Sequence, residues 1–223
     1  MKSKLLSNSD KLFDKGPSIY SEPVAFKHTV SLSRLLSDPE EFDDVLQLMQ
    51  QAGEADTITF LLNNHGGSID VLLPLINFLE MTSATTIALC TGSQSSAATV
   101  FAMYCDELIA LDHSAFMIHE MQTGHAGTIS NVMRDTQHAE KRNSRLIQEA
   151  YGGFLTDKEI ADVLRGVEIY LDSDEINARF SSRQDWRVEF YDKKREKFLQ
   201  GIQQEEEVEP EIVPAKPTKK GKA

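Results

Sequence analysis

Short apolar runs alternate with amphipathic stretches along most of this chain. The run 57–62 is almost continuously apolar, and so is the run 85–90, as is typical of strands buried on both faces. Their length of six residues and their flanking polar turns favour strands over helices. Further strands are predicted at 24–32, 107–111, 115–118 and 167–171.

Between these runs, apolar residues recur at helical spacing. The first helix has a clear start signal, with Asp38 as N-cap, Pro39 at the first position and Glu41 as capping-box partner. Four apolar residues then share one face of that helix: Phe42, Val45, Leu46 and Met49. Further helices are predicted at 68–81, 96–104, 128–150, 157–164 and 174–180.

The alternation of strands and helices predicts an α/β domain with a mostly parallel sheet. We place this domain at residues 23–180, after an N-terminal arm at 1–22. In a C-terminal extension, 181–204, the alternating stretch Trp186–Phe190 predicts an added strand or a surface segment. The charged tail 205–223 has an acidic run, three prolines and terminal lysines, and we expect it to be disordered.

Composition narrows the function classes. The net charge of −12 argues against a general nucleic-acid binder, because phosphate contacts require a basic face. No run approaches the roughly 20 apolar residues that cross a bilayer, and the N-terminus has no signal-peptide pattern. The two cysteines, Cys90 and Cys105, lie in apolar surroundings and are expected to be buried free thiols. We therefore expect a cytoplasmic protein.

Residues suited to acyl transfer follow three predicted strands. The pair Gly66-Gly67 can present backbone N–H groups, Ser96 starts a helix, and His119 ends a strand. Ligands of open α/β sheets gather at the carboxyl ends of strands. The three elements therefore read as oxyanion hole, nucleophile and base, with the N–H of Ala97 as a second oxyanion donor.

Each element also has a simpler interpretation. The glycines alone could form a plain tight turn, and they lack the spacing of a phosphate-binding loop. Ser96 could be only an N-cap, and Ser93 and Ser95 compete with it as nucleophiles. His119 could be a core or turn residue. No cofactor or metal is expected.

Glu168 is the candidate to orient the imidazole. It is an acidic residue within an otherwise apolar predicted strand, and such a residue usually requires a partner. The acidic residues that follow, Asp172, Asp174 and Glu175, have the pattern of a helix start instead.

Taken together, these motifs resemble the proteolytic subunit of the Clp protease, ClpP, and especially the short ClpP-like proteases of tailed phages. The family's N-S-P-G-G-S turn corresponds to residues 63–68, its G-Q-A-A-S-M-G to residues 92–98, and its V-M-I-H to residues 116–119. The resemblance, rather than any physical argument, selects Ser96 among the three serines and assigns the base to His119.

The family's third catalytic residue is an aspartate two positions before an aromatic–aliphatic pair. Glu168 stands there, before Tyr170-Leu171, 49 residues after His119, which itself follows Ser96 by 23 residues. The resemblance implies a Ser-His-Glu triad. Further departures are His65 for the family's proline, Ala97-Ala98 for Met-Gly, and Glu120-Met121 for Gln-Pro.

The resemblance also implies a fold, an assembly and partners. ClpP-like subunits have the crotonase-type fold, with turns of a ββα superhelix and a projecting handle helix, here the helix at 128–150. They form heptameric rings around a closed chamber, cut polypeptide substrates, and dock an ATP-driven AAA+ unfoldase such as ClpX or ClpA. Two alternatives remain: an inactive ring-forming scaffold, and a crotonase-type enzyme acting on an acyl-coenzyme A thioester.

Overall fold

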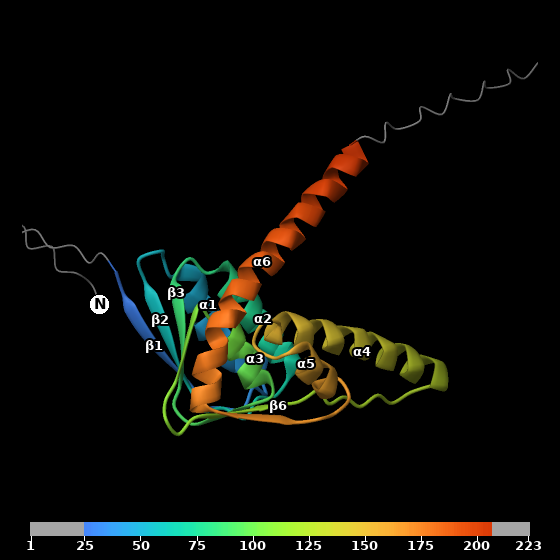
Figure 1. Cartoon of the computed structure of the whole chain (residues 1–223), viewed down its shortest axis with the longest axis horizontal. Coiled ribbons are helices and arrows are strands. Elements are labelled where there is room, and N and C mark those ends of the chain that lie inside the picture. The colour runs from blue at the N-terminus through green and yellow to red at the C-terminus, as the bar shows by residue number, and fades with distance from the viewer. Residues whose placement is uncertain (1–24, 207–223) are drawn as a thin grey trace, which may run out of the picture.

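A four-stranded parallel sheet carries the core. The computed structural model describes residues 25–206, with side chains described as far as residue 196 (Figure 1). The strands lie in the order β1-β2-β3-β5, all parallel. Alternate side chains of the two central strands, β2 and β3, are buried, among them Ile58, Phe60 and Ala88. The strand bounds are β1 Lys27–Leu32, β2 Thr57–Leu62, β3 Thr85–Cys90 and β5 Glu107–Ala110.

A second, three-stranded sheet lies beside the first. It consists of β4 (Ser93–Ser95), β6 (Ala115–Ile118) and β7 (Ile169–Asp172). The strand β6 pairs parallel with β4 and antiparallel with β7. The sequence analysis did not predict β4, because three polar residues are too short to show a period. The expectation of an α/β fold with a mostly parallel sheet is confirmed.

Helices pack on the sheets and extend from them (Figure 1). The helix α2 packs against α1 and α3, and α3 is buried along its whole length. By contrast, α4 and α6 both reach away from the body. The bounds are η1 Pro39–Phe42, α1 Asp43–Gln51, α2 Ile69–Met81, α3 Ala97–Tyr104, α4 Ile129–Tyr151, α5 Asp157–Val163 and α6 Ser173–Glu206.

The first helix starts differently from the prediction. Asp38 is an N-cap, but it caps the 3₁₀ turn η1, accepting the N–H of Glu40 at 3.1 Å, and the α-helix begins only at Asp43. Glu41 pairs with Arg34 at 3.5 Å instead of closing a capping box. A capping box needs an α-helical first turn, which the 3₁₀ turn does not provide.

From Ser173 to Glu206 the chain is one continuous helix, so of the two alternatives for Trp186–Phe190 the added strand is wrong. The two aromatic rings at its ends are four residues apart and stack at 4.7 Å between centroids. Spacing of four suits a helix face as well as strand alternation. Asn177 of α6 satisfies the edge of the large sheet, accepting the N–H of Ala110 at 2.9 Å and donating to its carbonyl at 2.8 Å.

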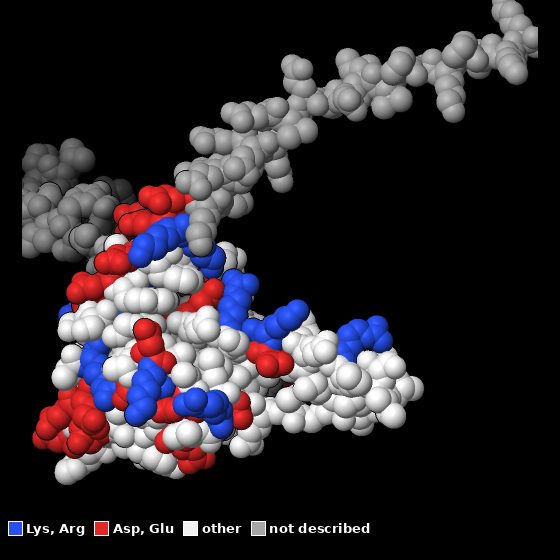
Figure 2. All heavy atoms as spheres, turned by 45° about the vertical axis from the view of Figure 1, so that its right-hand side comes forward, with Lys and Arg blue, Asp and Glu red and all other residues white. Residues whose placement is uncertain are grey.

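The predicted arm at 1–22 and nearly all of the predicted tail lie outside the described residues. On the face shown in Figure 2, acidic and basic side chains are interspersed over the body, with no single basic patch.

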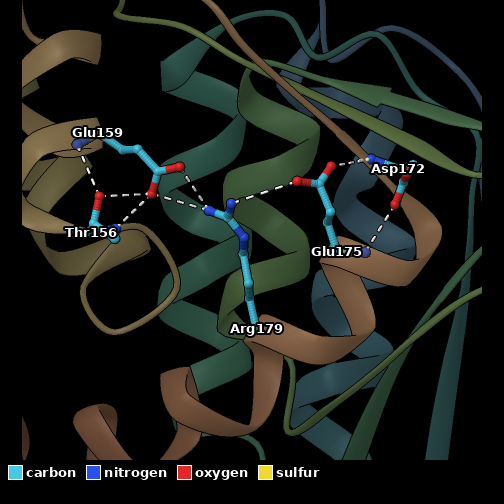
Figure 3. Close-up of polar contacts among 5 residues, drawn as sticks. All are labelled: Thr156, Glu159, Asp172, Glu175 and Arg179. Carbon is cyan, nitrogen blue, oxygen red and sulfur yellow. Dashed lines mark hydrogen bonds and ion pairs between the residues drawn. The ribbon is translucent and has the colours of Figure 1, made fainter.

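A polar network joins α5, α6 and the end of β7 (Figure 3). Thr156 and Glu159 form a capping box at the start of α5. Arg179 donates to both carboxylate oxygens of Glu159, at 3.0 and 3.1 Å, and lies 3.7 Å from Glu175. Glu175 exchanges hydrogen bonds with Asp172, the last residue of β7. These contacts hold β7 against the helices on either side of it in sequence.

The pH dependence of stability should report this network. Burial raises the pKa of Glu159, but the N–H of Thr156 and the Arg179 guanidinium outweigh it, so the net pKa is lowered. Its stabilising contribution is therefore complete above the unfolded pKa of about 4.3 and is lost as the pH falls through the lower folded value. Glu159→Gln should lower the free energy of unfolding at pH 7 by about 1–2 kcal/mol and flatten its acid dependence, measured by urea unfolding at fixed protein concentration.

The matched control is Glu189→Gln, which removes an exposed ion pair with Lys193. It should change stability by less than about 0.5 kcal/mol. Equal effects of the two variants would contradict a structural role for the network.

Candidate active site

The glycine turn after β2 is held by a buried asparagine. The Asn64 side chain donates to the carbonyls of Leu32 (3.2 Å) and Arg34, and its Oδ1 accepts the N–H of Gly66 at 2.7 Å. An asparagine side chain that bonds the backbone two residues on stabilises a turn in place of a proline. The exposed His65 therefore occupies the family's proline position in a turn that Asn64 fixes.

Both positions of the turn require glycine, because other backbone segments approach them too closely for a side chain. Gly66 and Gly67 have φ of 90° and 137°, a region that favours glycine. A Cβ on Gly66 would lie 2.6 Å from the carbonyl oxygen of Ser95 and 2.9 Å from the N of Ala97. Leu36 bonds the backbone on both sides of Gly67. The N–H of Gly67 has no partner among the described residues.

Ser96 has a strained backbone at the start of α3. With φ 56° and ψ −127°, it is the one non-glycine residue of the described chain with positive φ, a conformation that costs on the order of 1–3 kcal/mol. Its N–H donates to the carbonyl of Met117 at 2.9 Å. Its hydroxyl forms no capping hydrogen bond, which does not support the interpretation as a plain N-cap. The N–H of Ala97, at the helix N-terminus, also has no partner among the described residues.

His119 directly follows β6 and lies near Ser96. The pairing of Ser95 with Met117 in the small sheet ends β4 just before Ser96 and leaves His119 two residues beyond Met117. The loop that follows is fixed by Asn143 of α4, whose Oδ1 accepts the N–H of Met121 at 3.0 Å. His119 is therefore held from both directions: the pairing of β4 with β6 fixes the chain before it, and Asn143 fixes the chain after it.

One cavity of about 710 Å³ joins these elements. Gly67, Ser96, Ala97 and His119 all line it, whereas Ser93 and Ser95 do not. Gly66 does not line it and is buried against the segment from Ser95 to Ala97. Apolar side chains from four elements form much of the wall: Leu72, Val100, Met117, Leu146 and Ile147.

Polar residues also line this cavity that the sequence analysis did not select as site residues. Asp70 and Arg142 form an ion pair at 3.5 Å across α2 and α4. His125 and His138 come from the segment after β6 and from α4. No sequence motif marks these positions, because only the tertiary packing of α4 brings them to the cavity.

Glu168 lies next to this constellation but does not line the cavity. The register pairs Ile118 with Ile169, so Glu168 stands opposite His119, one step beyond the last pair. Its carboxylate is exposed and accepts the Tyr170 hydroxyl at 2.6 Å, a contact that raises the pKa of Tyr170. Among the described side chains, no hydrogen bond joins Glu168 to His119.

Comparison with known proteins identifies the family. The sequence model of the Clp protease family matches residues 38–173, which is more than half of the chain. The chain belongs to the Clp protease family. The matched range contains both glycines, Ser96, His119 and Glu168, so the family resemblance drawn from the motifs is confirmed. No protein with a curated function matches the chain.

Clp proteases are peptidases, and this family generally acts on polypeptides as an oligomer. The relation to the phage type stays a prediction. Within residues 25–206, no helix is long and apolar enough to cross a membrane.

The thiols of this Clp family member are poor candidates for the nucleophile. Cys90 and Cys105 are free and buried, as predicted. Burial raises the pKa of Cys90 to about 12 and that of Cys105 well above its ordinary value. A thiol attacks as its thiolate, so neither is active at neutral pH. Among the described residues, no cluster of His, Cys, Asp and Glu is suited to a metal ion.

The strain at Ser96 generates a stability prediction. Because glycine adopts positive φ without steric cost, Ser96→Gly should be more stable than Ser96→Ala by about 1 kcal/mol. Chemical denaturation of the two variants measures the difference, and Ser114→Gly against Ser114→Ala provides the control at a buried serine of ordinary backbone geometry. There the order should reverse. A less stable Ser96→Gly would show that the backbone at Ser96 is not strained.

Proposed function

We propose that this chain is a serine endopeptidase subunit of the Clp type. The observation that carries the proposal is the shared cavity, where a half-buried serine, a half-buried histidine and two unpartnered backbone N–H groups meet. Those are the parts that a hydroxyl nucleophile needs for amide hydrolysis.

In the proposed mechanism, the Ser96 Oγ attacks the carbonyl carbon of the scissile peptide while His119 accepts its proton. The resulting oxyanion receives hydrogen bonds from the N–H groups of Gly67 and Ala97. Collapse of the tetrahedral intermediate breaks the C–N bond, and His119 gives the proton to the leaving amine. Water then attacks the acyl-enzyme, again with His119 as base, and restores Ser96. Each oxyanion donor is worth about a hundred- to a thousandfold in rate.

Glu168 orients His119 in this proposal. Its place opposite His119 in the β6–β7 register supports the role, because the side chains of residues opposite one another in an antiparallel pair are neighbours on the same face. A carboxylate at this position fixes the tautomer of the base and stabilises the imidazolium.

The assembly we propose is a heptameric ring, with α4 as the handle through which two rings meet. The exposed half of α4 carries Ile129 and Met133, which are 81% and 59% exposed, and exposed apolar side chains of this kind favour a protein contact. Polypeptides enter the enclosed chamber with the help of an AAA+ unfoldase such as ClpX or ClpA, in the cytoplasm.

Two rival functions are less well supported. An inactive scaffold has no need of a strained serine whose hydroxyl is free of capping bonds. A crotonase-type enzyme acting on acyl-coenzyme A would use backbone N–H groups, but not a serine and a histidine on the same cavity.

Covalent labelling tests the peptidase. Incubation of the assembled full-length chain with a fluorophosphonate should place the adduct on Ser96, identified by peptide mapping, because the probe traps a base-activated serine. His119→Ala should slow labelling by at least about a hundredfold. Glu168→Gln should slow it by a similar factor, and Glu168→Asp should keep most of the rate.

Two variants control for indirect effects. Ser93→Ala changes an exposed neighbouring serine, and His113→Ala changes an exposed histidine outside the cavity. Both should label at the normal rate. A folded, assembled sample without an adduct on Ser96 would reject the proposed function.

Native mass spectrometry tests the assembly. The chain should appear as a multiple of seven subunits, and Met133→Glu should convert paired rings to single rings, because it places a charge in the handle contact. Asn131→Asp adds a negative charge at an exposed position of α4 on the face opposite Ile129 and Met133; it is the control and should leave the mass of the assembly unchanged. A stable monomer would contradict the ring.

A further inference from the structure

A buried hydrogen-bond chain connects the end of α4 to the backbone of Ser96. Tyr151, the last residue of α4, has its hydroxyl 2.6 Å from the Oγ1 of Thr99. The Thr99 Oγ1 in turn donates to the carbonyl oxygen of Ser96 at 2.7 Å. Thr99 is completely buried and Tyr151 is 1% exposed, so water does not compete with either bond.

The number of protons available decides which group donates and which accepts in each of these hydrogen bonds. The Ser96 carbonyl can only accept, so the one hydroxyl proton of Thr99 points toward it. The Tyr151 hydroxyl must then donate to Thr99. Burial raises the pKa of Tyr151, so the phenol keeps this proton throughout the working pH range. Consecutive hydrogen bonds of one direction polarise and strengthen one another in a low dielectric.

The acceptor is the peptide unit that matters most to the proposed chemistry. The carbonyl of Ser96 and the N–H of Ala97 belong to the same planar peptide. Any rotation of that carbonyl therefore turns the Ala97 N–H away from the oxyanion and moves the strained Ser96 with it. The N–H of Thr99 also binds this carbonyl, at 3.0 Å, but only the hydroxyl chain ties it to another element.

The far end of the chain is itself firmly held. Gly152 and Gly153, directly after Tyr151, lie so close to Trp186 of α6 that a side chain at either position would collide with it. The buried Arg183 donates to the carbonyl of Glu149 at 3.0 Å and lies over the same ring at 5.1 Å. The end of α4 that carries Tyr151 is thus held by α6 through residues on both sides of Tyr151.

We propose that Tyr151 and Thr99 are positioning residues for the proposed peptidase reaction, forming a relay that holds the Ser96–Ala97 peptide in its strained, oxyanion-binding orientation. Neither side chain lines the cavity, so neither touches substrate. The effect of the relay on the reaction rate rests on the proposed function. Its effect on the order of the backbone around Ser96 does not depend on that function.

The rate of fluorophosphonate labelling at Ser96 measures the effect in the assembled full-length chain. Thr99→Val, which replaces the hydroxyl by a methyl of similar size, should slow labelling about ten- to a hundredfold, because small misplacements at a reacting centre have effects of that order. Tyr151→Phe should slow it about three- to tenfold, since the bond from Thr99 to Ser96 survives. Thr99→Ser should restore at least half of the normal rate.

Two further comparisons separate positioning from general destabilisation. Thr86→Val is the matched control, because Thr86 is also completely buried and its hydroxyl also makes a hydrogen bond, 2.7 Å to Asp106. It should reduce stability without slowing labelling. In the double variant, Tyr151→Phe should slow labelling less than twofold beyond the effect of Thr99→Val, because the effects of substitutions within one hydrogen-bond network are not additive.

Hydrogen exchange of the peptide containing Ser96 to Val100 gives a readout that needs no activity. Exchange should accelerate in Thr99→Val, but not in Thr99→Ser or Thr86→Val. If the unmodified chain labels, and Thr99→Val and Tyr151→Phe both label as fast as the unmodified chain, the relay is wrong while the peptidase stands. If the unmodified chain does not label, the peptidase fails, and unchanged exchange in Thr99→Val would overturn the relay as well.

Discussion

The strained peptide at Ser96 is the constraint on which the rest of the site depends. A serine with φ of 56° persists only where its surroundings over-determine it. Here the N–H of Ser96 is bound by β6 and its carbonyl by the first turn of α3. The small sheet fixes one side of the residue and the buried helix fixes the other. The turn between them is sharp enough to leave the hydroxyl free over the cavity and the next N–H unpartnered.

The glycine turn depends on the same peptide. Gly66 can lie against Ser95 and Ala97 only because it has no Cβ, and this approach brings Gly67 to the cavity that Ser96 lines. Asn64 replaces the restriction that a proline would give, at the cost of burying a polar side chain whose bonds to Leu32, Arg34 and Gly66 satisfy it. The departure of His65 from the family's motif is thus compensated one residue earlier.

Features of the fold and the site that depend on neighbouring residues could be predicted from the sequence, whereas features that depend on residues far apart in sequence could not. The buried strands 57–62 and 85–90 and the helix after Ser68 have local periods and caps, and they were found. The start of α1 was misplaced because a 3₁₀ turn and an α-helical turn share the same cap residues. The extent of α6 was missed because its contacts, such as Asn177 with β5 and Trp186 with the glycines after α4, are far apart in sequence. The three serines at 93–96 could not be ranked physically, since their exposure to the cavity is set by the unpredicted β4.

Glu168 shows why a matching motif does not by itself complete a triad. The register puts the residue opposite His119, yet the carboxylate is exposed and bonded to Tyr170, which is itself 68% exposed. An exposed carboxylate has water as a competitor, and its attraction for an imidazolium is weak until water is excluded. The Val167 and Tyr170 side chains beside it are large, apolar and uncovered, a surface typical of subunit contacts. In the proposed ring, covering this strand would bury that surface, exclude water from Glu168 and so strengthen its attraction for His119. Assembly and the proposed catalysis would then be linked through β7, whereas Gly67, Ser96, Ala97 and His119 already line one cavity within a single subunit.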